Sequence, residues 1–342
     1  MVLILSFLSC LNSNKVKRLN VPSEEGVIAL CPGEVMPLKV NAKMRNGKRK
    51  STTQTGRQNL NWKHLEMRLD GQPMSGSVAM PQDPKLTWQR PLTLKVWLTN
   101  RPEMIWEGQV VARYDCNYVV DLRGSSGQTG TYATDDAQHG DDGATSSEER
   151  GGAGEDGAHG QAGGNGGLGN LGNQAQVYLV SSATADGLLE ARVELSGSQN
   201  TWTYLMTPGA SALVLDVSGG TGGQGGIGQN GGQGGAGGTG IQTGNGGKGG
   251  NGGDGGDGGD GGDGGTAELI VDPNAQPWVD SITLRSQGGP GGGPGAPGYA
   301  GQGGAGDPMG QDGLDGRTGR AGRAGGPGEI LPVRVTTVTP GF

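Results

Sequence analysis

Short apolar runs separated by turn signals fill the first third of the chain. Two of these runs, PLKVNAKM (37–44) and LTLKVWLT (92–99), alternate apolar and polar positions with a period of two. Such alternation is typical of a strand with one face on a core and the other in water. Asn46-Gly47 and Asp70-Gly71 are hairpin signals, because these residue types tolerate positive φ. We therefore predict a mainly β, immunoglobulin-like sandwich over residues 20–123.

A second pattern begins after residue 123, where glycine recurs at every third position. It holds this phase from 151 to 172, from 219 to 240 and from 246 to 264, and from 289 to 328 except at Asp307. A flexible linker has no reason to keep such a phase. A period of three residues is that of the left-handed extended helix. The phase therefore predicts ordered, extended glycine segments.

Two architectures use this helix, and the glycine content distinguishes them. Collagen winds three chains with one glycine per triplet, and the prolines and single glycines of 289–328 fit it loosely. Residues 219–266 contain no proline and are mostly Gly-Gly-X. A second glycine costs about 0.5–1 kcal/mol of backbone entropy and is useful only where two faces of a helix are covered. We favour a bundle within one chain, with Gly-Gly-X inside and Gly-X-Y at the rim. A collagen-like trimeric stalk is the alternative.

The glycine blocks resemble a known group of proteins. GGTGGQGGIGQNGGQGGAGGTG and GGKGGNGGDGGDGGDGGDGG are similar to the polyglycine-II helix bundles of snow-flea antifreeze protein and of tail-fibre tip adhesins from some T-even-like phages. The resemblance covers about residues 124–330 and rests on glycine phase. It implies a rigid display scaffold, with receptor contacts in loops between glycine segments. Ice binding is a second alternative, although the X positions from Thr221 to Thr239 form no regular threonine array.

Apolar, β-rich stretches interrupt the glycine blocks. They lie at 176–217, 267–286 and 329–339. We expect the first two to form β-hairpins and the last to add a strand, all inserted in a polyglycine-II bundle over 124–342. Glycine faces carry few side chains for recognition, so binding residues are expected at a hairpin tip. The candidates are Asp272, Asn274, Gln276 and Trp278. Packing within the hairpin is the alternative role for the tryptophan.

Charge divides the chain at the same boundary as composition. Residues 1–123 carry 18 Lys+Arg against 10 Asp+Glu, and the rest carry 8 against 23, which together give the formal net charge of −7. A basic half suggests an anionic partner. Apart from Lys48-Arg49-Lys50, however, the basic residues form no run. We predict a solvated basic face and no nucleic-acid partner.

Two charged ladders repeat at the three-residue step. They consist of Asp254, Asp257, Asp260 and Asp263, and of Arg317, Arg320 and Arg323. Successive aspartates lie about 9 Å apart at ~3.1 Å per residue, which is too far for joint coordination of calcium at about 2.3–2.6 Å. One hypothesis is that the aspartate edge lies beside the arginine edge and sets the register of two helices. The alternative is two independent solubilising edges.

Three cysteines, Cys10, Cys31 and Cys116, bear on the compartment. FLSC (7–10) resembles the lipobox of bacterial lipoproteins, in which the cysteine is acylated, although phenylalanine replaces the usual leucine and no basic residue precedes it. Residues 1–19 are then a signal or lipid-anchor remnant and tether. Acylation of Cys10 would leave Cys31 and Cys116 as a disulfide candidate in an oxidising compartment. The alternative is three reduced cysteines and an ordinary N-terminus.

Chemistry-bearing motifs are not evident. Phosphate-loop, EF-hand and Ser/His/Asp spacings are missing, so we predict no catalytic residues, no metal site, no cofactor and no enzyme activity. The expected function is a non-enzymatic, extracytoplasmic structural or adhesive protein, anchored or docked by its front domain. We expect it at the cell envelope or surface, as an outer-membrane lipoprotein if Cys10 is acylated. A protein or glycan partner fits this role, with membrane contact only through the anchor; the oligomeric state stays open.

Overall fold

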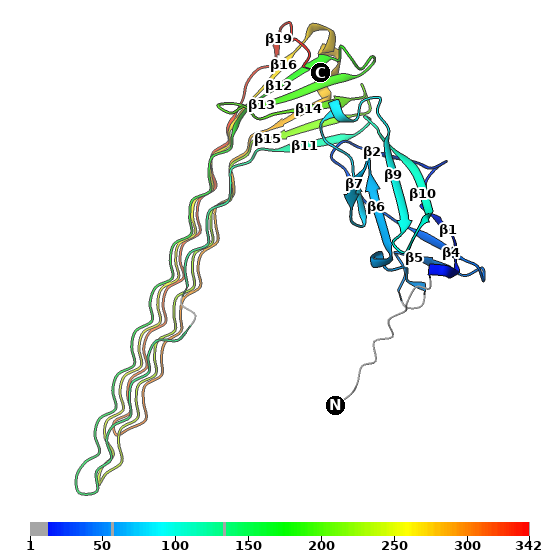
Figure 1. Cartoon of the computed structure of the whole chain (residues 1–342). Helices are drawn as coiled ribbons and strands as arrows, with labels where there is room; N and C mark the ends of the chain where they lie inside the picture. Colours follow the sequence, from blue (N-terminus) through cyan, green and yellow to red (C-terminus); the bar gives the residue numbers. More distant parts are fainter. Residues whose placement is uncertain (1–12, 56–57, 133–134, 342) are drawn as a thin grey trace.

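The computed structural model describes residues 13–55, 58–132 and 135–341, so the acylation candidate Cys10 lies outside the described residues. Three parts follow one another in space (Figure 1). We call them the front domain (16–112), the head, which contains the strands from Asn117 onward, and the shaft, which contains the glycine segments. The shaft and the front domain both extend from the head, and the shaft is a long narrow rod.

The front domain is built from short strands whose buried residues alternate with exposed ones. One sheet has the order β1–β4–β5, formed by β1 (Val16–Asn20), β4 (Asn41–Met44) and β5 (Arg49–Ser51). A second has the order β2–β10–β9–β6–β7, formed by β2 (Val27–Leu30), β10 (Arg101–Ala112), β9 (Leu92–Leu98), β6 (Leu65–Leu69) and β7 (Gln72–Met74). β3 (Val35–Pro37) pairs with β8 (Ser77–Ala79). The 3-10 helix η1 (Ser13–Lys15) precedes β1, and the connections include the 3-10 helices η3 (Trp62–His64) and η4 (Pro84–Leu86).

The predicted alternation in 92–99 is realised in β9, where Leu92, Leu94, Val96 and Leu98 are buried. They join one apolar cluster with residues of β1, β4 and β6. The β content of this part is compatible with the expected immunoglobulin-like sandwich. Its predicted limits of 20–123 differ from the observed strands, because β1 begins at Val16. At the other end, residues 117–121 belong to the head, because Tyr118 and Val120 are buried in the head's core.

The head contains two sheets around a second apolar cluster. One has the order β11–β15–β17, formed by β11 (Asn117–Asp121), β15 (Ala212–Asp216) and β17 (Ile282–Arg285), with parallel pairing throughout. The other has the order β14–β13–β12–β16–β18, formed by β14 (Thr201–Met206), β13 (Leu189–Leu195), β12 (Gln174–Ser181), β16 (Thr266–Val271) and β18 (Glu329–Ile330), and β19 (Arg334–Val335) also pairs with β16. Leu179, Leu213 and Leu269 are buried between them.

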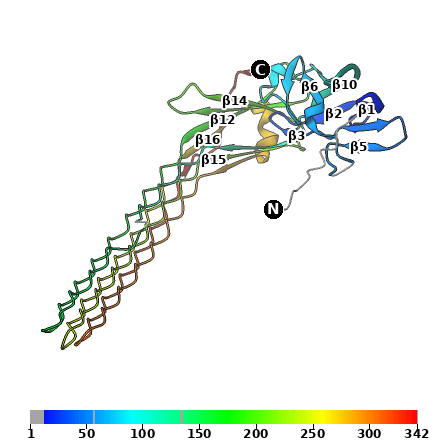
Figure 2. The same ribbon diagram turned by 60° about the horizontal axis from the view of Figure 1, so that its bottom comes forward.

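Among the described residues, six extended segments form the shaft (Figure 2). Three lead away from the head after β11, β15 and β17; they are 124–146 (apart from 133–134), 217–240 and 287–306. Three return to β12, β16 and β18; they are 151–172, 244–265 and 310–328. Each set is one layer of parallel neighbours that continues one sheet of the head. About 22 residues at ~3.1 Å each give a shaft length of about 70 Å.

Backbone hydrogen bonds join every segment to its neighbours. One zigzag crosses all six segments, with each N–H donating to the next carbonyl at 2.7–2.9 Å, through Gly322, Gly292, Gly259, Gly223, Gly167 and Gln128. Buried peptide groups need such partners, because unpaired ones are costly. A Cβ at most shaft glycines would lie closer than 3.0 Å to a neighbouring backbone atom. Packing of backbone on backbone therefore explains the glycine phase.

Glycine content follows the number of neighbouring segments. Segments 217–240 and 244–265 each have four hydrogen-bonded neighbours and are mostly Gly-Gly-X. Segments 124–146 and 310–328 lie at the corners with two neighbours each and need one glycine per triplet. The number of faces without side chains therefore matches the number of covered faces.

The predicted polyglycine-II helix bundle is corrected by the structure. The regular secondary structure is mainly β, and the helices of the described residues are short 3-10 helices, with no glycine-rich helix bundle. The physical reason lies in the hydrogen bonds. Those of the shaft backbone run between segments and none closes a turn within a segment, so the shaft contains none of the helices of the described residues. The glycine segments are extended chain laid side by side.

The predicted hairpins also need correction. Within 267–286, β16 and β17 lie in different sheets and are joined by the 3-10 helix η5 (Pro273–Ser281). Within 176–217, β12, β13 and β14 form an antiparallel meander, whereas β15 crosses to the other sheet. The chain must cross between the two sheets of the head, because the segments that return from the shaft enter one sheet and the segments that lead into the shaft leave from the other.

The register of the head continues into the shaft. Thr266 pairs with Glu329 across β16 and β18, a separation of 63 residues, and Asp254 and Arg317 in the shaft are also separated by 63. Leu213 pairs with Ile282, and Asn230 contacts Tyr299, both at a separation of 69. The apolar core of the head thus fixes a register that the glycine segments alone do not specify.

The front domain is tied to the head at one junction. Cys31, which follows β2, is joined by a disulfide to Cys116, which precedes β11, with a Cα–Cα distance of 6.0 Å. The Gln82 amide donates a hydrogen bond of 3.0 Å to the Tyr204 hydroxyl. Burial raises the pKa of Tyr204, while its contact with Gln82 opposes that shift. A covalent link and a polar contact therefore join the two parts.

Candidate functional site

The aspartate ladder lies beside the arginine ladder, but the contact differs from an ion pair. The Oδ1 atoms of Asp254, Asp257, Asp260 and Asp263 accept backbone N–H groups at 2.6–2.7 Å, from Arg317, Arg320, Arg323 and Gly326. None of the ion pairs among the described residues joins an aspartate of this ladder to a guanidinium group. The carboxylates thus satisfy outward N–H groups of a corner segment.

The same arrangement recurs in other parts of the shaft. Asn165 Oδ1 accepts from the N–H of Asp257, Asp156 Oδ1 from that of Lys248, and Asn230 Oδ1 from that of Tyr299. In the triplet Gly255-Gly256-Asp257, the N–H groups of the two glycines donate to carbonyl oxygens of neighbouring segments. The N–H group of the aspartate donates to the Asn165 side chain. Short polar side chains at X positions therefore complete the hydrogen bonding that backbone alone leaves open.

Replacement of Asp260 separates its acceptor role from its charge. We expect Asp260→Ala to speed amide hydrogen exchange at Arg323 by an amount equivalent to about 0.5–1.5 kcal/mol, the usual net value of one hydrogen bond. Asp260→Asn keeps Oδ1 and should leave that exchange rate near the parent value. Equal acceleration in both variants, or a similar effect of Arg323→Gln, would instead indicate that charge holds the two segments together.

The predicted binding tip lies on η5, at the end of the head opposite the shaft. Asp272 is buried; its Oδ1 accepts from the N–H of Asn274 and its Oδ2 from that of Val338. This residue caps η5 and holds the C-terminal segment, which corrects its predicted place on a hairpin tip. Asn274, Gln276 and Trp278 are exposed on the same helix, and the tryptophan ring lies 3.8 Å from a Cβ position at Gly209.

A different set of turns meets at the distal end of the shaft. Arg150 donates through Nε to the carbonyl of Thr243 at 3.1 Å and through Nη2 to Asn245 Oδ1 at 2.7 Å. Its Nη2 also contacts the carbonyl oxygen of Asp307. One guanidinium thus links the three turns of the shaft tip. Sequence reasoning missed this role, because the partners are 93 to 157 residues away.

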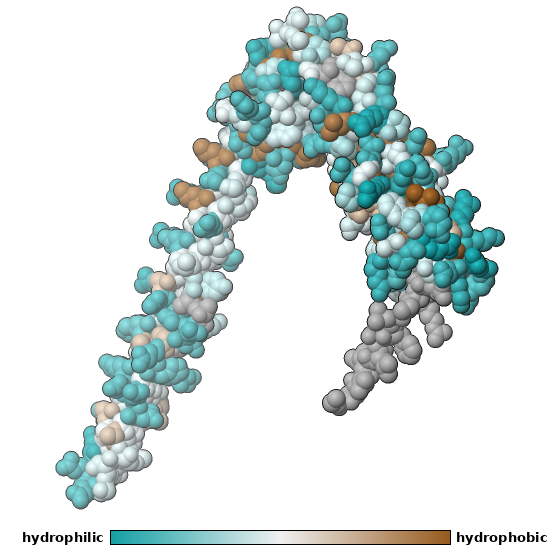
Figure 3. Space-filling model, in the orientation of Figure 1, coloured by the Kyte–Doolittle hydropathy of each residue, from teal (hydrophilic) through white to brown (hydrophobic). Residues whose placement is uncertain are grey.

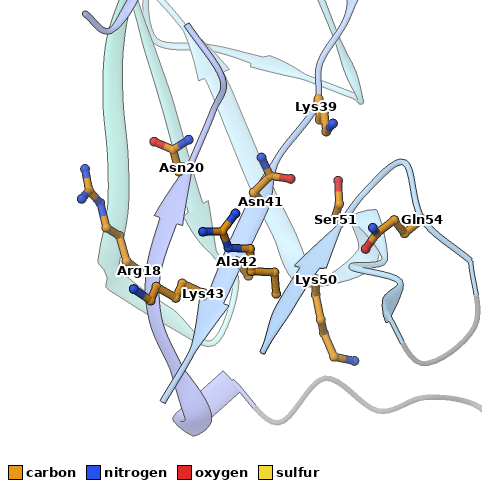
Figure 4. Close-up of a pocket in the computed structure, with 10 residues that line it drawn as sticks. Arg18, Asn20, Lys39, Asn41, Ala42, Lys43, Lys50, Ser51 and Gln54 are labelled. Atoms are coloured by element: carbon orange, nitrogen blue, oxygen red, sulfur yellow. The ribbon is translucent and has the colours of Figure 1, made fainter. Parts of the chain in front are cut away.

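A basic groove lies on the front domain, on the sheet β1–β4–β5 (Figure 4). It is a concavity of about 420 Å³ whose lining includes five cationic residues, Arg18, Lys39, Lys43, Arg49 and Lys50. The other described residues of the lining are Asn20, Asn41, Ala42, Ser51 and Gln54, and none of the described lining residues is a carboxylate. These positions are scattered over about 35 residues of sequence, so the sequence shows only Lys48-Arg49-Lys50 as a basic run.

His64 lies near enough to Lys50 of the groove to feel its positive charge. The pKa of His64 is lowered by burial first, and then by the positive charges of Lys63 and Lys50. Its Nε2 is buried without a hydrogen-bond partner. The neutral imidazole is therefore favoured beside the groove.

No protein-family model, curated protein or solved structure matches the chain. Among the described residues, no helix has the length and apolar character needed to cross a bilayer. Over the same residues, no group of three or more His, Cys, Asp or Glu side chains is placed to hold a metal ion.

Proposed function

We propose that this chain is a non-enzymatic structural or adhesive protein of the cell envelope, anchored or docked by its front domain. In this role the shaft is a stiff spacer that holds its tip about 70 Å from the head. The observation that carries the proposal is the lattice of inter-segment backbone hydrogen bonds. Bending the shaft would break many of these bonds together, because adjacent segments share them.

The chemistry of the shaft tip supports display. Ile241 and Met309 have exposed fractions of 74% and 70%, and the turn containing Glu148 and Glu149 lies at the same end. The side chains of these turns, and not glycine backbone, form the surface that a partner would meet at the end of the shaft. Arg150 holds the turns together, so these side chains are presented from a fixed backbone.

Surface display is tested by labelling the tip on intact cells. We expect Ile241→Cys to react with a membrane-impermeant maleimide in the cells that make the protein, several-fold above the parent chain. Asn46→Cys, on the front domain, reports whether that domain is covered by the surface on which it docks. Reaction of Ile241→Cys only after lysis would overturn surface display, whatever the shaft's stiffness.

A further inference from the structure

The basic groove carries a binding role that deepens the docking part of the proposed function and rests on it. Four other cations of the front domain and its junction have carboxylate partners, in the pairs Arg90–Asp70, Lys95–Glu107, Arg101–Glu103 and Arg113–Asp115. Among the described residues, none of the five groove cations forms an ion pair or a side-chain hydrogen bond. Five cations without carboxylate partners thus share one concavity, whereas others, such as Lys17, Lys63 and Lys85, are spread outside it.

Close like charges disfavour one another, and a concave surface focuses their field. The chain's own carboxylates do not relieve this repulsion within the groove. Most of the groove's charged side chains are exposed, on strands whose alternate residues, such as Leu19 and Met44, are buried in the core. The fold therefore presents the cations on one rigid face without needing them for packing, an arrangement that suits an anionic ligand.

We propose that the groove binds an acidic oligosaccharide, with carboxylate or phosphate groups on its sugar rings. Lysine and arginine side chains fit the anionic groups. The carboxamides of Asn20, Asn41 and Gln54 supply donors and acceptors for sugar hydroxyls. Among the residues that the structure describes, the lining contains no aromatic residue. Single-stranded nucleic acids, by contrast, are usually held by base stacking on aromatic rings. Figure 3 shows that this end of the front domain is strongly hydrophilic.

Binding is tested with the purified full chain by titration calorimetry at low salt. The probes are hexagalacturonate, which carries carboxylates, a phosphorylated mannose oligosaccharide, and maltohexaose as a neutral match. The groove variant combines Lys43→Gln, Arg49→Gln and Lys50→Gln. Its control removes the same charge outside the groove, by Lys17→Gln, Lys63→Gln and Lys85→Gln, all at exposed positions.

We expect at least one acidic oligosaccharide to bind at least tenfold more weakly to the groove variant than to the parent. The control variant should keep affinity within about threefold, and maltohexaose should not bind. Binding of hexagalacturonate identifies carboxylate as the recognised group, and binding of the phosphorylated oligosaccharide identifies phosphate. Absence of binding to both acidic probes, or equal binding by the groove variant, overturns the proposal.

A thymidine decanucleotide is a further probe. If it binds in the groove with an affinity equal to or higher than that of the acidic oligosaccharides, the oligosaccharide proposal is overturned in favour of nucleic acid. Circular dichroism of each variant checks that the fold is retained. These measurements are made in solution, whereas surface display is measured on cells. Failure of the ligand proposal is therefore distinguishable from failure of the display role.

Discussion

Gly256→Ala is expected to lower the free energy of unfolding by about 3 kcal/mol, whereas Gly293→Ala should leave it within 1 kcal/mol of the parent. A Cβ at Gly256 would lie closer than 3.0 Å to the carbonyl group of Gly164 in the neighbouring segment. The obstructing atoms are backbone, which cannot rotate away as a side chain does. The segments must separate, which also weakens the bond from the Gly256 N–H to the Gly226 carbonyl, 2.8 Å in the parent.

Gly293 is a matched control because it makes the same chemical change on the same shaft. No atom lies within 4 Å of its Cβ position, and the residue is exposed. Alanine there restricts the unfolded chain without obstructing the folded one. Denaturant unfolding followed by circular dichroism measures both variants, and hydrogen exchange of shaft amides locates the effect. Equal destabilisation by both substitutions would show that backbone contact does not explain the glycine phase.

Removal of the disulfide by Cys31→Ser with Cys116→Ser is expected to lower the free energy of unfolding by about 3–4 kcal/mol. The bond joins residues separated by 85 positions, and closing a long loop removes much conformational entropy from the unfolded chain. The bond also links the front domain to the head, so its loss should affect the front domain more than the shaft. Denaturant unfolding with and without reductant measures the change.

The double variant also shows whether any other thiol contributes. Reductant should destabilise the parent chain by a similar 3–4 kcal/mol and should leave the double variant unchanged. A double variant within 1 kcal/mol of the oxidised parent would mean that the noncovalent junction, including the contact between Gln82 and Tyr204, already holds the two parts. A further effect of reductant on that variant would point to Cys10.

Local sequence pattern predicted more of the fold than of the candidate sites. The period-two run 92–99 became β9, and the three-residue glycine phase marked the extended segments, because both periods follow directly from backbone geometry. The helix bundle was wrong, since the three-residue period specifies an extended backbone with glycine-lined faces, and the regular structure that forms around it is mainly β. The hairpin over 267–286 was wrong because the choice of sheet for β16 and β17 depends on strands far away in the chain.

The candidate sites were harder to predict, because their residues are far apart in the sequence. The repeats of aspartate and arginine were visible as two ladders, yet their contact, carboxylate to backbone N–H, depends on how the two segments are aligned. Arg150 and the basic groove gave almost no local signal, because their residues come from separate strands or turns. The acylation candidate Cys10 stays a prediction.

By itself the sequence determined where side chains are excluded, since glycine alone lets two backbones approach within the distance of a Cβ. Only the tertiary structure decided which segments become neighbours and at which register. Glycine triplets are nearly identical to one another, so a shift by one triplet leaves their contacts almost unchanged. The apolar strands of the head are not interchangeable, and their pairing, such as Thr266 with Glu329, sets the alignment that the whole shaft follows.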